Sequence, residues 1–500
     1  MALTVTPDMT TISLCESTSG WSGGSTNDAF KLEGLYCLGD KVSEALGTLR
    51  TYAFGSNQDM SNGEHIYAWI LCQGKPDTKA NGGIRIYVED SSGNYGYWYV
   101  GGNDNYPGGW ICYVLDPSSA YTNGSGTINT ASIAKVGIQF KMLSKALGNN
   151  PNVFWDAWRY GKGLRITSGL ADQIDFDDIV AEEENDNYWG IIRKVNGVFY
   201  IQGQLTFGNS SSGSIDFIDK GELIVFIDSE FINTNFYEIN ILANAGGTTN
   251  FVLGEKSGGR GISGCFLKAG TKIFKFTATD ANIDKLLIYG STFYKAGQVL
   301  FPANSVNRET INCNFEECGE ISANTFVMEF CNIINAVDGG LRLSSISHNV
   351  INSNFINCPR AIEIDTTGTY SFNALKFAEN TLDIDNTSGG LVTVNCSNGS
   401  NPATYSGNTD IQNTKMLTLT GLIENSEVRI FEAGTINELG GIENSSTSFI
   451  YEYSYVPETY IDIVVHKEDR IYYRINNYLL PAADSSLPIS QQLDRQYSNP

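Results

Sequence analysis

Apolar and polar residues alternate in many short segments over the first third of the chain. In Tyr95–Val100, for example, tyrosine alternates with glycine, tryptophan and valine. Successive side chains of a strand point to opposite faces, so a period of two predicts strands with one buried face. Gly, Asn, Asp, Ser or Pro separates most of these segments and predicts turns. The predicted strands are Thr48–Phe54, His65–Cys72, Gly83–Val88, Tyr95–Val100, Gly109–Leu115, Ala134–Met142 and Asn152–Trp158.

Strands of this number and spacing predict a sandwich or jelly roll, which we assign to residues 1–190. All seven tryptophans fall in this segment, and none follows Trp189. Just before its end, Asp175 precedes apolar residues at Phe176, Ile179 and Val180. That spacing predicts one short helix with an aspartate N-cap.

A different pattern occurs five times between Ile288 and Asn380. A small or apolar residue stands two positions before a Phe or Ile, with offsets of 22 (291 to 313), 18 (313 to 331), 22 (331 to 353) and 22 (353 to 375). A unit this short cannot bury its own apolar face and must stack on copies of itself. A leucine-rich repeat would need a dense Leu ladder, whereas Phe, Asn and β-branched residues favour strands. We therefore predict a right-handed parallel β-helix over residues 191–413.

The repeat also predicts which side chains point into the coils. One inward column is mostly aromatic and consists of Phe293, Phe315, Ile333, Phe355 and Phe377. A column of small residues with the same strand parity lies two positions earlier and consists of Ser291, Cys313, Cys331 and Ser353. Asn314, Asn332 and Asn354 form a third column. We interpret these asparagines as structural corner residues, because Asn tolerates the αL conformation and its amide can bond along the axis.

After Asn413 the repeat stops and short alternating segments return. They are Met416–Leu419, Glu427–Glu432, Ser448–Tyr455, Tyr460–Val465 and Arg470–Ile475. This pattern predicts a small β-sandwich over residues 414–485. The polar tail, residues 486–500, is predicted to be an arm that orders only on a partner.

Composition and charge exclude several classes of protein. The chain has 500 residues, which is too long for one core, and a net charge of −23 with no Lys/Arg cluster, so it is not expected to bind nucleic acid. The first residues have no basic region and no continuous apolar run, so we expect no signal peptide and no membrane insertion. The ten cysteines lack metal-type spacing and are interpreted as reduced thiols of a chain folded in a cytoplasm. No P-loop or dinucleotide fingerprint is present, so no cofactor and no metal are expected.

The stretch Tyr95–Trp110 combines Tyr and Trp residues with Asn and Asp, and carbohydrate-binding sites use the same two kinds of side chain. The candidate glycan-binding residues are Tyr95, Tyr97, Trp98, Tyr99, Asn103, Asp104, Asn105, Tyr106 and Trp110. The alternative is that Trp98 and Trp110 belong to the core, which the alternation requires for at least one of them. Asn103–Asn105 and the aspartates at 175, 177 and 178 are also oxygen donors of the kind Ca²⁺ takes, although a turn and a helix start explain them more simply.

An enzymatic alternative rests on charged residues of the repeat region. Glycosidases and lyases need two carboxylates across a groove, or a base beside a cation. The residues on or near the coils are Glu316, Glu317, Glu320, Asp338, Arg342, His348, Glu363 and Asp365. None lies in a distinctive motif, and the three histidines of the chain accompany no nucleophile signature. We therefore predict no catalytic residues and interpret these groups as solvated coil faces and turns.

The order of parts resembles virion structural proteins of tailed phages, which build capsid, neck or tail appendages. The local phrases that carry the resemblance are Gly161–Ile166, Phe176–Ile179, Gly197–Gly203 and Glu427–Thr435. The resemblance implies a concanavalin/lectin-like jelly roll at the N-terminus and a fibre, spike or decoration protein. It further implies folding in a host cytoplasm, a place in the virion, contacts with other virion proteins, a homotrimer, and contact with a host-surface glycan. The runner-up is a polysaccharide-degrading appendage.

Overall fold

The computed structural model describes residues 3–43, 45–143, 150–209, 213–227, 230–270, 272–303, 307–323 and 325–496, without the side chains of residues 170–172. In this part of the chain nearly every element is a strand, which confirms the all-β prediction. The chain divides into two compact units, Met1–Pro302 with Val306–Arg308, and Ala303–Ser305 with Glu309–Pro500. The domain boundaries at 190, 413 and 485 stay predictions. The last four residues of the expected arm, 497–500, lie outside the described residues.

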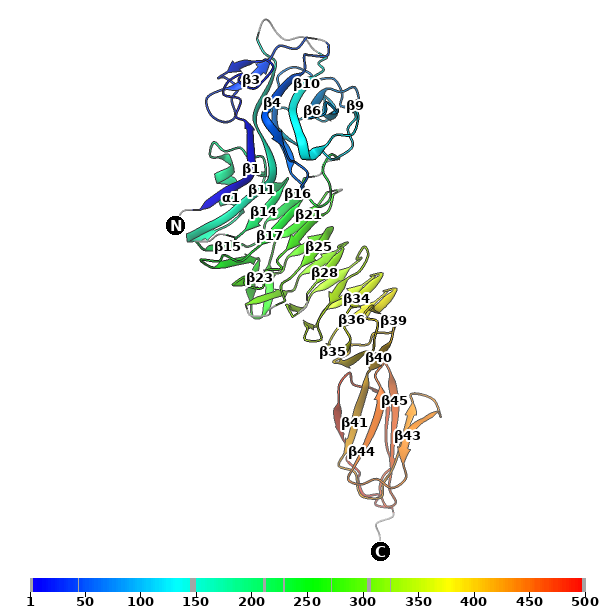
Figure 1. Cartoon of the computed structure of the whole chain (residues 1–500). Helices are drawn as coiled ribbons and strands as arrows, with labels where there is room; N and C mark the ends of the chain where they lie inside the picture. Colours follow the sequence, from blue (N-terminus) through cyan, green and yellow to red (C-terminus); the bar gives the residue numbers. More distant parts are fainter. Residues whose placement is uncertain are drawn as a thin grey trace. The chain divides into compact units, whose positions relative to one another are not determined.

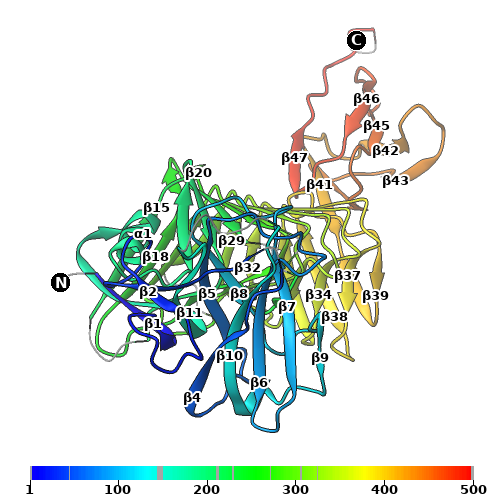
Figure 2. The same ribbon diagram turned by 90° about the horizontal axis from the view of Figure 1, so that it is seen from above.

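The first unit begins with two sheets that share one core. The five-stranded sheet has the order β4 (Arg50–Gln58), β10 (Ile133–Phe140), β6 (Ile84–Asp90), β7 (Tyr95–Gly101) and β9 (Asn123–Ser125), and Figure 2 shows these strands side by side. The facing strands are β1 (Thr4–Ser13), β2 (Ser25–Asn27), β3 (Cys37–Asp40), β5 (His65–Cys72), β8 (Ile111–Leu115) and β11 (Val153–Ile174). Ile86, Trp98 and Val136 from one sheet pack with Ile66 and Trp155 from the other. We call these two sheets the head.

Strand β11 joins the head to the first coil. It pairs antiparallel with β1 and β5, and it then runs parallel to β14 (Gln204–Phe207) through the pairs from Gly163↔Gln204 to Ile166↔Phe207. Gly163 allows this pairing, because a Cβ there would lie 2.0 Å from the carbonyl oxygen of Gln204. The predicted strand Asn152–Trp158 is thus only the first part of a longer one. Sequence reasoning missed the extension and β1.

The predicted short helix is α1 (Phe176–Glu184). Asp175 caps it, because its side chain accepts a hydrogen bond from the backbone N–H of Asp178 while the Asp178 side chain accepts one from Asp175. This reciprocal capping confirms the predicted N-cap and explains these two carboxylates without an ion. No helix in the described ranges is long and apolar enough to cross a bilayer.

Parallel coils follow in the first unit (Figure 1), and the strand pairing gives each coil one strand in each of three parallel ladders, which we call its three sheets. Opening the first coil, β12 (Ile192–Val195) pairs antiparallel with β13. The first sheet holds β13 (Val198–Ile201), β16 (Leu223–Phe226), β21 (Phe266–Ala269) and β24 (Thr292–Tyr294). The second holds β14, β17 (Glu238–Ile241), β22 (Phe274–Thr277) and β25 (Ala296–Leu300), and the third β15 (Ile215–Asp219), β18 (Thr249–Leu253) and β23 (Lys285–Tyr289). The hairpin β19 (Glu255–Ser257) and β20 (Arg260–Ser263) interrupts this pattern.

The second unit repeats the same three-sheet coil. Its first sheet holds β27 (Asn314–Glu316), β30 (Asn332–Ile334), β33 (Asn354–Ile356) and β36 (Lys376–Ala378). Its second holds β28 (Glu320–Ser322), β31 (Leu341–Leu343), β34 (Arg360–Ile364), β37 (Leu382–Asn386) and β39 (Tyr405–Ser406). Its third holds β26 (Arg308–Ile311), β29 (Val327–Glu329), β32 (Asn349–Ile351), β35 (Gly368–Asn373), β38 (Val392–Ser397) and β40 (Thr409–Gln412). The parallel pairing matches the predicted β-helix.

The predicted aromatic column of this unit is confirmed. Phe315, Ile333, Phe355 and Phe377 are in register on neighbouring strands. The first three are fully buried, and Phe377 is half-buried because β36 is the last strand of its sheet. Its ring stacks on Phe355 with the centroids 5.5 Å apart.

The asparagine column is structural, as predicted, but it does not form corners. The Asn332 amide donates to Asn314 Oδ1 at 2.8 Å, and the Asn354 amide donates to Asn332 Oδ1 at 2.6 Å. All three residues begin strands rather than turns. Other asparagines take the left-handed corners, namely Asn312, Asn335, Asn352 and Asn357, with φ between 51° and 58°.

All ten cysteines lie within the described residues, and each is a buried, free thiol. Burial raises the pKa of the Cys331 thiol, and the Cys313 thiol beside it raises it further. Thiols held in the protonated form behave as small hydrophobic groups, as the inward column predicted.

The second unit ends in two further sheets. One holds β44 (Ser448–Ser454), β41 (Thr414–Thr420) and β47 (Ser485–Pro488), and the other β43 (Glu438–Ile442), β42 (Glu427–Glu432), β45 (Tyr460–His466) and β46 (Tyr473–Leu479). Leu417, Leu419, Ile430, Ile463 and Val465 contribute to their shared core. Strands β43 and β47 were not expected from the sequence.

Candidate functional site

The outer face of the five-stranded sheet carries the tyrosines of the predicted glycan stretch. In β7, Trp98 and Val100 are buried in the core, whereas the alternate residues Tyr95, Tyr97 and Tyr99 lie on the outer face and are partly exposed. The hydroxyl groups of these three tyrosines make no hydrogen bond with any described residue. They are therefore free to bond a ligand.

Strands β6 and β10 extend this face with charged and amide side chains. The sheet register places them in three rows, which are Lys135–Glu89–Tyr95, Gly137–Tyr87–Tyr97 and Gln139–Arg85–Tyr99. We call these nine residues the tyrosine face. Only the tyrosines of β7 were predicted from the sequence. The others could have been found from the alternation in Gly83–Val88 and Ala134–Met142, once the pairing of those segments with β7 was known.

The rings of the tyrosine face contact one another. The Tyr87 centroid lies 5.0 Å from that of Tyr97 and 5.8 Å from that of Tyr95. The guanidinium carbon of Arg85 lies 4.6 Å from the centroid of Tyr99. Aromatic pairs at these separations stabilise each other, so the partly exposed rings of Tyr95 and Tyr97 pack on the buried ring of Tyr87.

The polar groups of the face are fixed by one another. Lys135 Nζ lies 2.7 Å from Glu89 Oε1, and the Tyr87 hydroxyl donates to the same carboxylate. Burial alone would raise the pKa of Glu89, but hydrogen bonds from Lys135 and Tyr87 hold that pKa below its ordinary value. Arg85 donates to Gln139 Oε1 at 3.3 Å. Gln139 is buried and its amide nitrogen donates to the Gly47 carbonyl, so this side chain only holds Arg85 in place. An ionised carboxylate and a guanidinium beside aromatic rings are groups that bind sugar hydroxyls and C–H faces.

Trp98 corrects the predicted glycan-binding set. Its relative exposure is 0%, and its indole N–H donates to Ser119 Oγ at 3.0 Å. The ring therefore cannot stack on a ligand. Its place on the inner side follows from the same alternation that puts Tyr97 and Tyr99 outside.

The loop after β7 holds itself together and does not join the tyrosine face. Asp104 Oδ1 accepts the N–H of Lys79 at 2.8 Å, and Asn105 Oδ1 accepts that of Gly102 at 2.7 Å. The Tyr106 hydroxyl donates to the Gly109 carbonyl at 2.5 Å and accepts the N–H of Cys72 at 2.8 Å. Asn103 is exposed and its side chain makes no bond to a described residue. This loop is a fixed turn, and the cation alternative is not needed to explain it.

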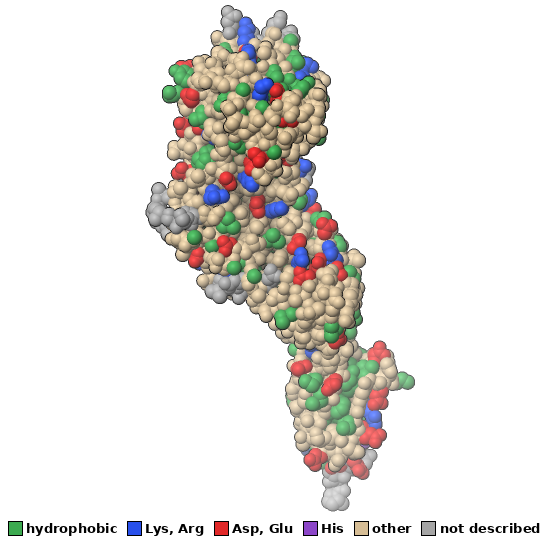
Figure 3. Space-filling view, in the orientation of Figure 1, with side chains coloured by type: hydrophobic (Ala, Val, Ile, Leu, Met, Phe, Trp, Pro, Cys, Tyr) green, Lys and Arg blue, Asp and Glu red, His purple; other side chains and the backbone are tan. Residues whose placement is uncertain are grey.

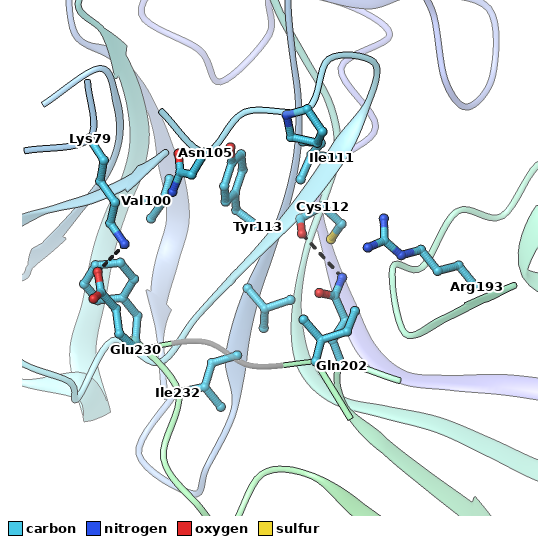
Figure 4. A pocket seen from close by; sticks show the side chains of 14 residues that line it. Lys79, Val100, Asn105, Ile111, Cys112, Tyr113, Arg193, Gln202, Glu230 and Ile232 are labelled. Atoms are coloured by element: carbon cyan, nitrogen blue, oxygen red, sulfur yellow. Dashed lines mark hydrogen bonds and ion pairs between the residues drawn. The ribbon is translucent and has the colours of Figure 1, made fainter. Parts of the chain in front are cut away.

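Asn105 and Trp110 line a different site, a groove along the outer side of β8. Two cavities of about 570 Å³ and about 220 Å³ share Cys112, Arg193 and Gln202 and so form one groove, and Figure 4 shows the residues that line the larger cavity. We call it the β8 groove. It lies inside the first unit, between the head and the first coil. Trp69, Trp110 and Tyr200 line the smaller cavity, and Lys79, Asn105 and Glu230 line the larger one.

Both tryptophans of the β8 groove have their indole N–H groups occupied by the protein. Trp110 donates to the carbonyl of Phe30 at 3.0 Å and Trp69 to that of Tyr188 at 2.7 Å. The ring edges and faces that remain are half-exposed. Burial raises the pKa of Glu183, which also lines the groove, to about 7, although the N–H groups of Gly190 and Ile191 donate to it.

Five of the eight residues in the enzymatic alternative gather on one coil face of the second unit. Figure 3 shows acidic and basic side chains together where β28 and β34 lie in Figure 1. The Arg342 guanidinium forms ion pairs with Asp365 (Nη2 to Oδ2, 2.8 Å) and Glu320 (Nη1 to Oε1, 3.6 Å). Arg360 Nη1 lies 2.9 Å from Glu363 Oε2. Arg360 also donates to the carbonyl of Asp338.

These carboxylates are tied to arginines. Burial alone would raise the pKa of Asp365, but hydrogen bonds from Ser344 and Arg342 hold it below its ordinary value. A general acid needs a raised pKa, so Asp365 is not suited to that role. His348 is half-buried against Tyr370 and Phe372, and this partial burial lowers its pKa to about 4. Glu316 and Glu317 lie on and beside β27, on another sheet of the coil.

The comparisons with known proteins give little. No family model and no curated protein matches the chain. An agarase of solved structure is similar over 31% of this chain, with 14% identity and a TM-score of 0.23, and an exo-beta-agarase over 28%, with 13% identity and a TM-score of 0.20. The chain spans only 24% and 22% of the lengths of those proteins. At such TM-scores neither likeness says anything about function.

Proposed function

We propose that this protein is a structural component of a tailed-phage virion that binds a host-surface glycan through its tyrosine face. The observation that carries glycan binding is the row of free tyrosine hydroxyls beside Arg85 and Glu89. In this proposal the head is a concanavalin-like jelly roll, the coils wind right-handed as a stiff spacer, and the last two sheets are a small β-sandwich for attachment.

Two features support a neutral or hydroxyl-rich ligand on the tyrosine face. Lys135 and Glu89 neutralise each other, so Arg85 contributes the single net charge of the face beside its donors and acceptors. Rings that already pack on one another lose little freedom when a ligand stacks on them, which lowers the entropic cost of binding. The absence of a Lys/Arg cluster in the sequence is consistent with this and not with a phosphate-rich ligand.

The glycan-binding part is tested with the full chain on an array of bacterial surface polysaccharides, followed by titration of each ligand found. Tyr97→Ala is expected to weaken binding at least about tenfold, which corresponds to about 1.4 kcal/mol. The matched control is Tyr472→Ala, which removes a tyrosine that is 58% exposed on the second unit and should change nothing. Full binding by both Tyr97→Ala and Tyr99→Ala would refute the assignment of this face.

The virion part is tested by locating the chain in purified particles. Mass spectrometry of particles, followed by a particle map, should place it on the capsid, neck or tail beside other virion proteins. A soluble protein absent from every particle would remove this part of the proposal. Light scattering should give three times the chain mass of 54.6 kDa if the protein is a homotrimer, and one times that mass would exclude it.

A further inference from the structure

Arg193 stands out among the cations of the β8 groove. Lys79, at the other end, forms an ion pair with Glu230. Arg193 forms no ion pair with any described residue, and its guanidinium carbon lies over the face of Tyr200, 5.5 Å from the ring centroid. Figure 4 shows the guanidinium pointing across the groove toward Cys112 and Gln202. A guanidinium left unpaired in an acidic protein is available to an anionic ligand.

Gln202 supplies a matching group. Its amide nitrogen donates to the carbonyls of Gly190 at 2.7 Å and Cys112 at 3.4 Å. These bonds fix the side chain, while its Oε1 accepts no hydrogen bond from a described residue. Arg193 and Gln202 therefore present a bidentate donor and a fixed acceptor side by side.

The walls next to these groups are aromatic. Trp69, Trp110 and Tyr200 line the same cavity as Arg193 and Gln202. The cavity of about 220 Å³ opens into the larger one of about 570 Å³. Indole faces take the C–H side of a pyranose ring, and a guanidinium fork matches a carboxylate in two parallel hydrogen bonds. A small inorganic anion would use the fork and leave the tryptophans without contact.

We propose that the β8 groove is a second binding site, which takes a sugar that carries a carboxylate, such as a uronic acid unit of an acidic surface polysaccharide. Arg193 binds the carboxylate, Gln202 accepts a hydroxyl, and Trp69 and Trp110 pack against the ring. This site is separate from the tyrosine face and does not depend on ligand binding there. Glu183 and Glu184 line the smaller cavity as well, so the ligand's carboxylate faces Arg193 and not these two acidic side chains.

The test uses the full chain and two probes that differ only in the carboxylate, methyl glucuronide and methyl glucoside. Saturation-transfer NMR and tryptophan fluorescence follow binding, since Trp69 and Trp110 line the groove. The glucuronide should bind saturably, and the glucoside at least about tenfold more weakly. Binding of the glucuronide should weaken as salt is added. Equal binding of the two probes, or no saturable binding of the glucuronide, would overturn the proposal.

Variants separate this site from others. Arg193→Gln should weaken glucuronide binding at least about tenfold, and Arg193→Lys should recover only part of it because lysine lacks the fork. Arg360→Gln, which changes an arginine of the second unit, is the matched control and should bind as the unchanged protein does. Undiminished binding by Arg193→Gln contradicts the proposal, and so does inorganic phosphate that competes as well as the glucuronide.

Discussion

The tyrosine face and the outer faces of the later coils are both regular arrays of side chains, but they use their polar groups differently. On the coils, the asparagine side chains bond to the same position in the next copy of the repeat, as Asn332 does between Asn314 and Asn354. On the tyrosine face, the rings touch while the hydroxyls of Tyr95 and Tyr97 have no protein partner among the described residues. The repeat thus provides hydrogen-bond partners within the protein for the asparagines of the coils. The tyrosines of the head lack such repeated neighbours, and their hydroxyls remain available to a ligand.

The largest change in stability is expected from a substitution in the aromatic column inside the coils. Phe315→Ala removes a fully buried ring between coils and is expected to cost about 3–5 kcal/mol of unfolding free energy. Hydrogen exchange in residues 309–413 and thermal melting would measure it. Glycan binding by the tyrosine face should be unchanged below the melting temperature. A loss below about 1 kcal/mol would mean that the column does not carry the stack.

The second test uses pH, because buried and paired carboxylates respond in opposite directions. Burial raises the pKa of Glu183 from 4.5 to about 7, so its stabilising effect is complete below pH 4.5 and is lost as the pH rises to about 7. The loss is on the order of 3 kcal/mol, and Asp156, whose pKa burial also raises to about 7, acts in the same direction. Asp365 has a lowered pKa, so its contribution is lost only as the pH falls below 3.8.

Glu183→Gln makes this difference measurable. The glutamine imitates the protonated acid, so the variant should match the unchanged protein near about pH 5 and exceed it near about pH 8. Tryptophan fluorescence during denaturation reports the first unit alone, since all seven tryptophans precede residue 190. If the variant were the less stable protein at both pH values, Glu183 would instead stabilise the head as an ionised acceptor.

A smaller effect is expected from the asparagine ladder. Asn332→Ala leaves Asn314 Oδ1 and the Asn354 amide without their partner and should cost about 1–2 kcal/mol. Denaturant titration of the full chain would measure the change. Asn103→Ala is the control, since that side chain is exposed and makes no bond to a described residue. Equal stability of the two variants would show that the hydrogen bonds of the ladder do not contribute to the free energy of unfolding.

The smallest effect is expected from the charged coil face. Arg342→Gln breaks half-exposed ion pairs with Asp365 and Glu320 and should cost less than about 1 kcal/mol. The cost should shrink further at high salt. Incubation with host polysaccharide gives a second measurement on the same pair of proteins. Release of oligosaccharide by the unchanged protein, lost in Arg342→Gln, would turn this face into an active site.

Alternation predicted much of the fold, because it depends only on which side of a strand faces the core. His65–Cys72 and Glu427–Glu432 have the predicted bounds. Strand β11 was cut short at Trp158, because Gly161 and Gly163 punctuate the sequence there like a turn. In the fold these glycines permit close approach to β1 and β14.

The candidate site was predicted only in part, because its residues meet through strand pairing. Tyr97 and Tyr99 were identified on their own strand, but Tyr87 and Gln139 join them through register that one strand does not encode. Trp110 was grouped with Tyr97 by nearness in sequence, and the fold places it in the β8 groove instead. Arg193 carried no signal, since nothing in the sequence shows that an arginine lacks a carboxylate partner.

The spacing of the asparagine ladder fixes how much length each part of the chain provides. Asn332 and Asn354 are 22 residues apart and hydrogen-bonded across adjacent strands. Neighbouring strands lie about 4.8 Å apart, whereas the same residues in an extended linker would reach roughly 70 Å. The coils thus add little length per residue compared with an extended linker, and in exchange they form a stiff stack. Reach therefore changes only with the number of coils, because the spacings of 18 residues from Asn314 to Asn332 and of 22 from Asn332 to Asn354 both bridge one pair of adjacent strands.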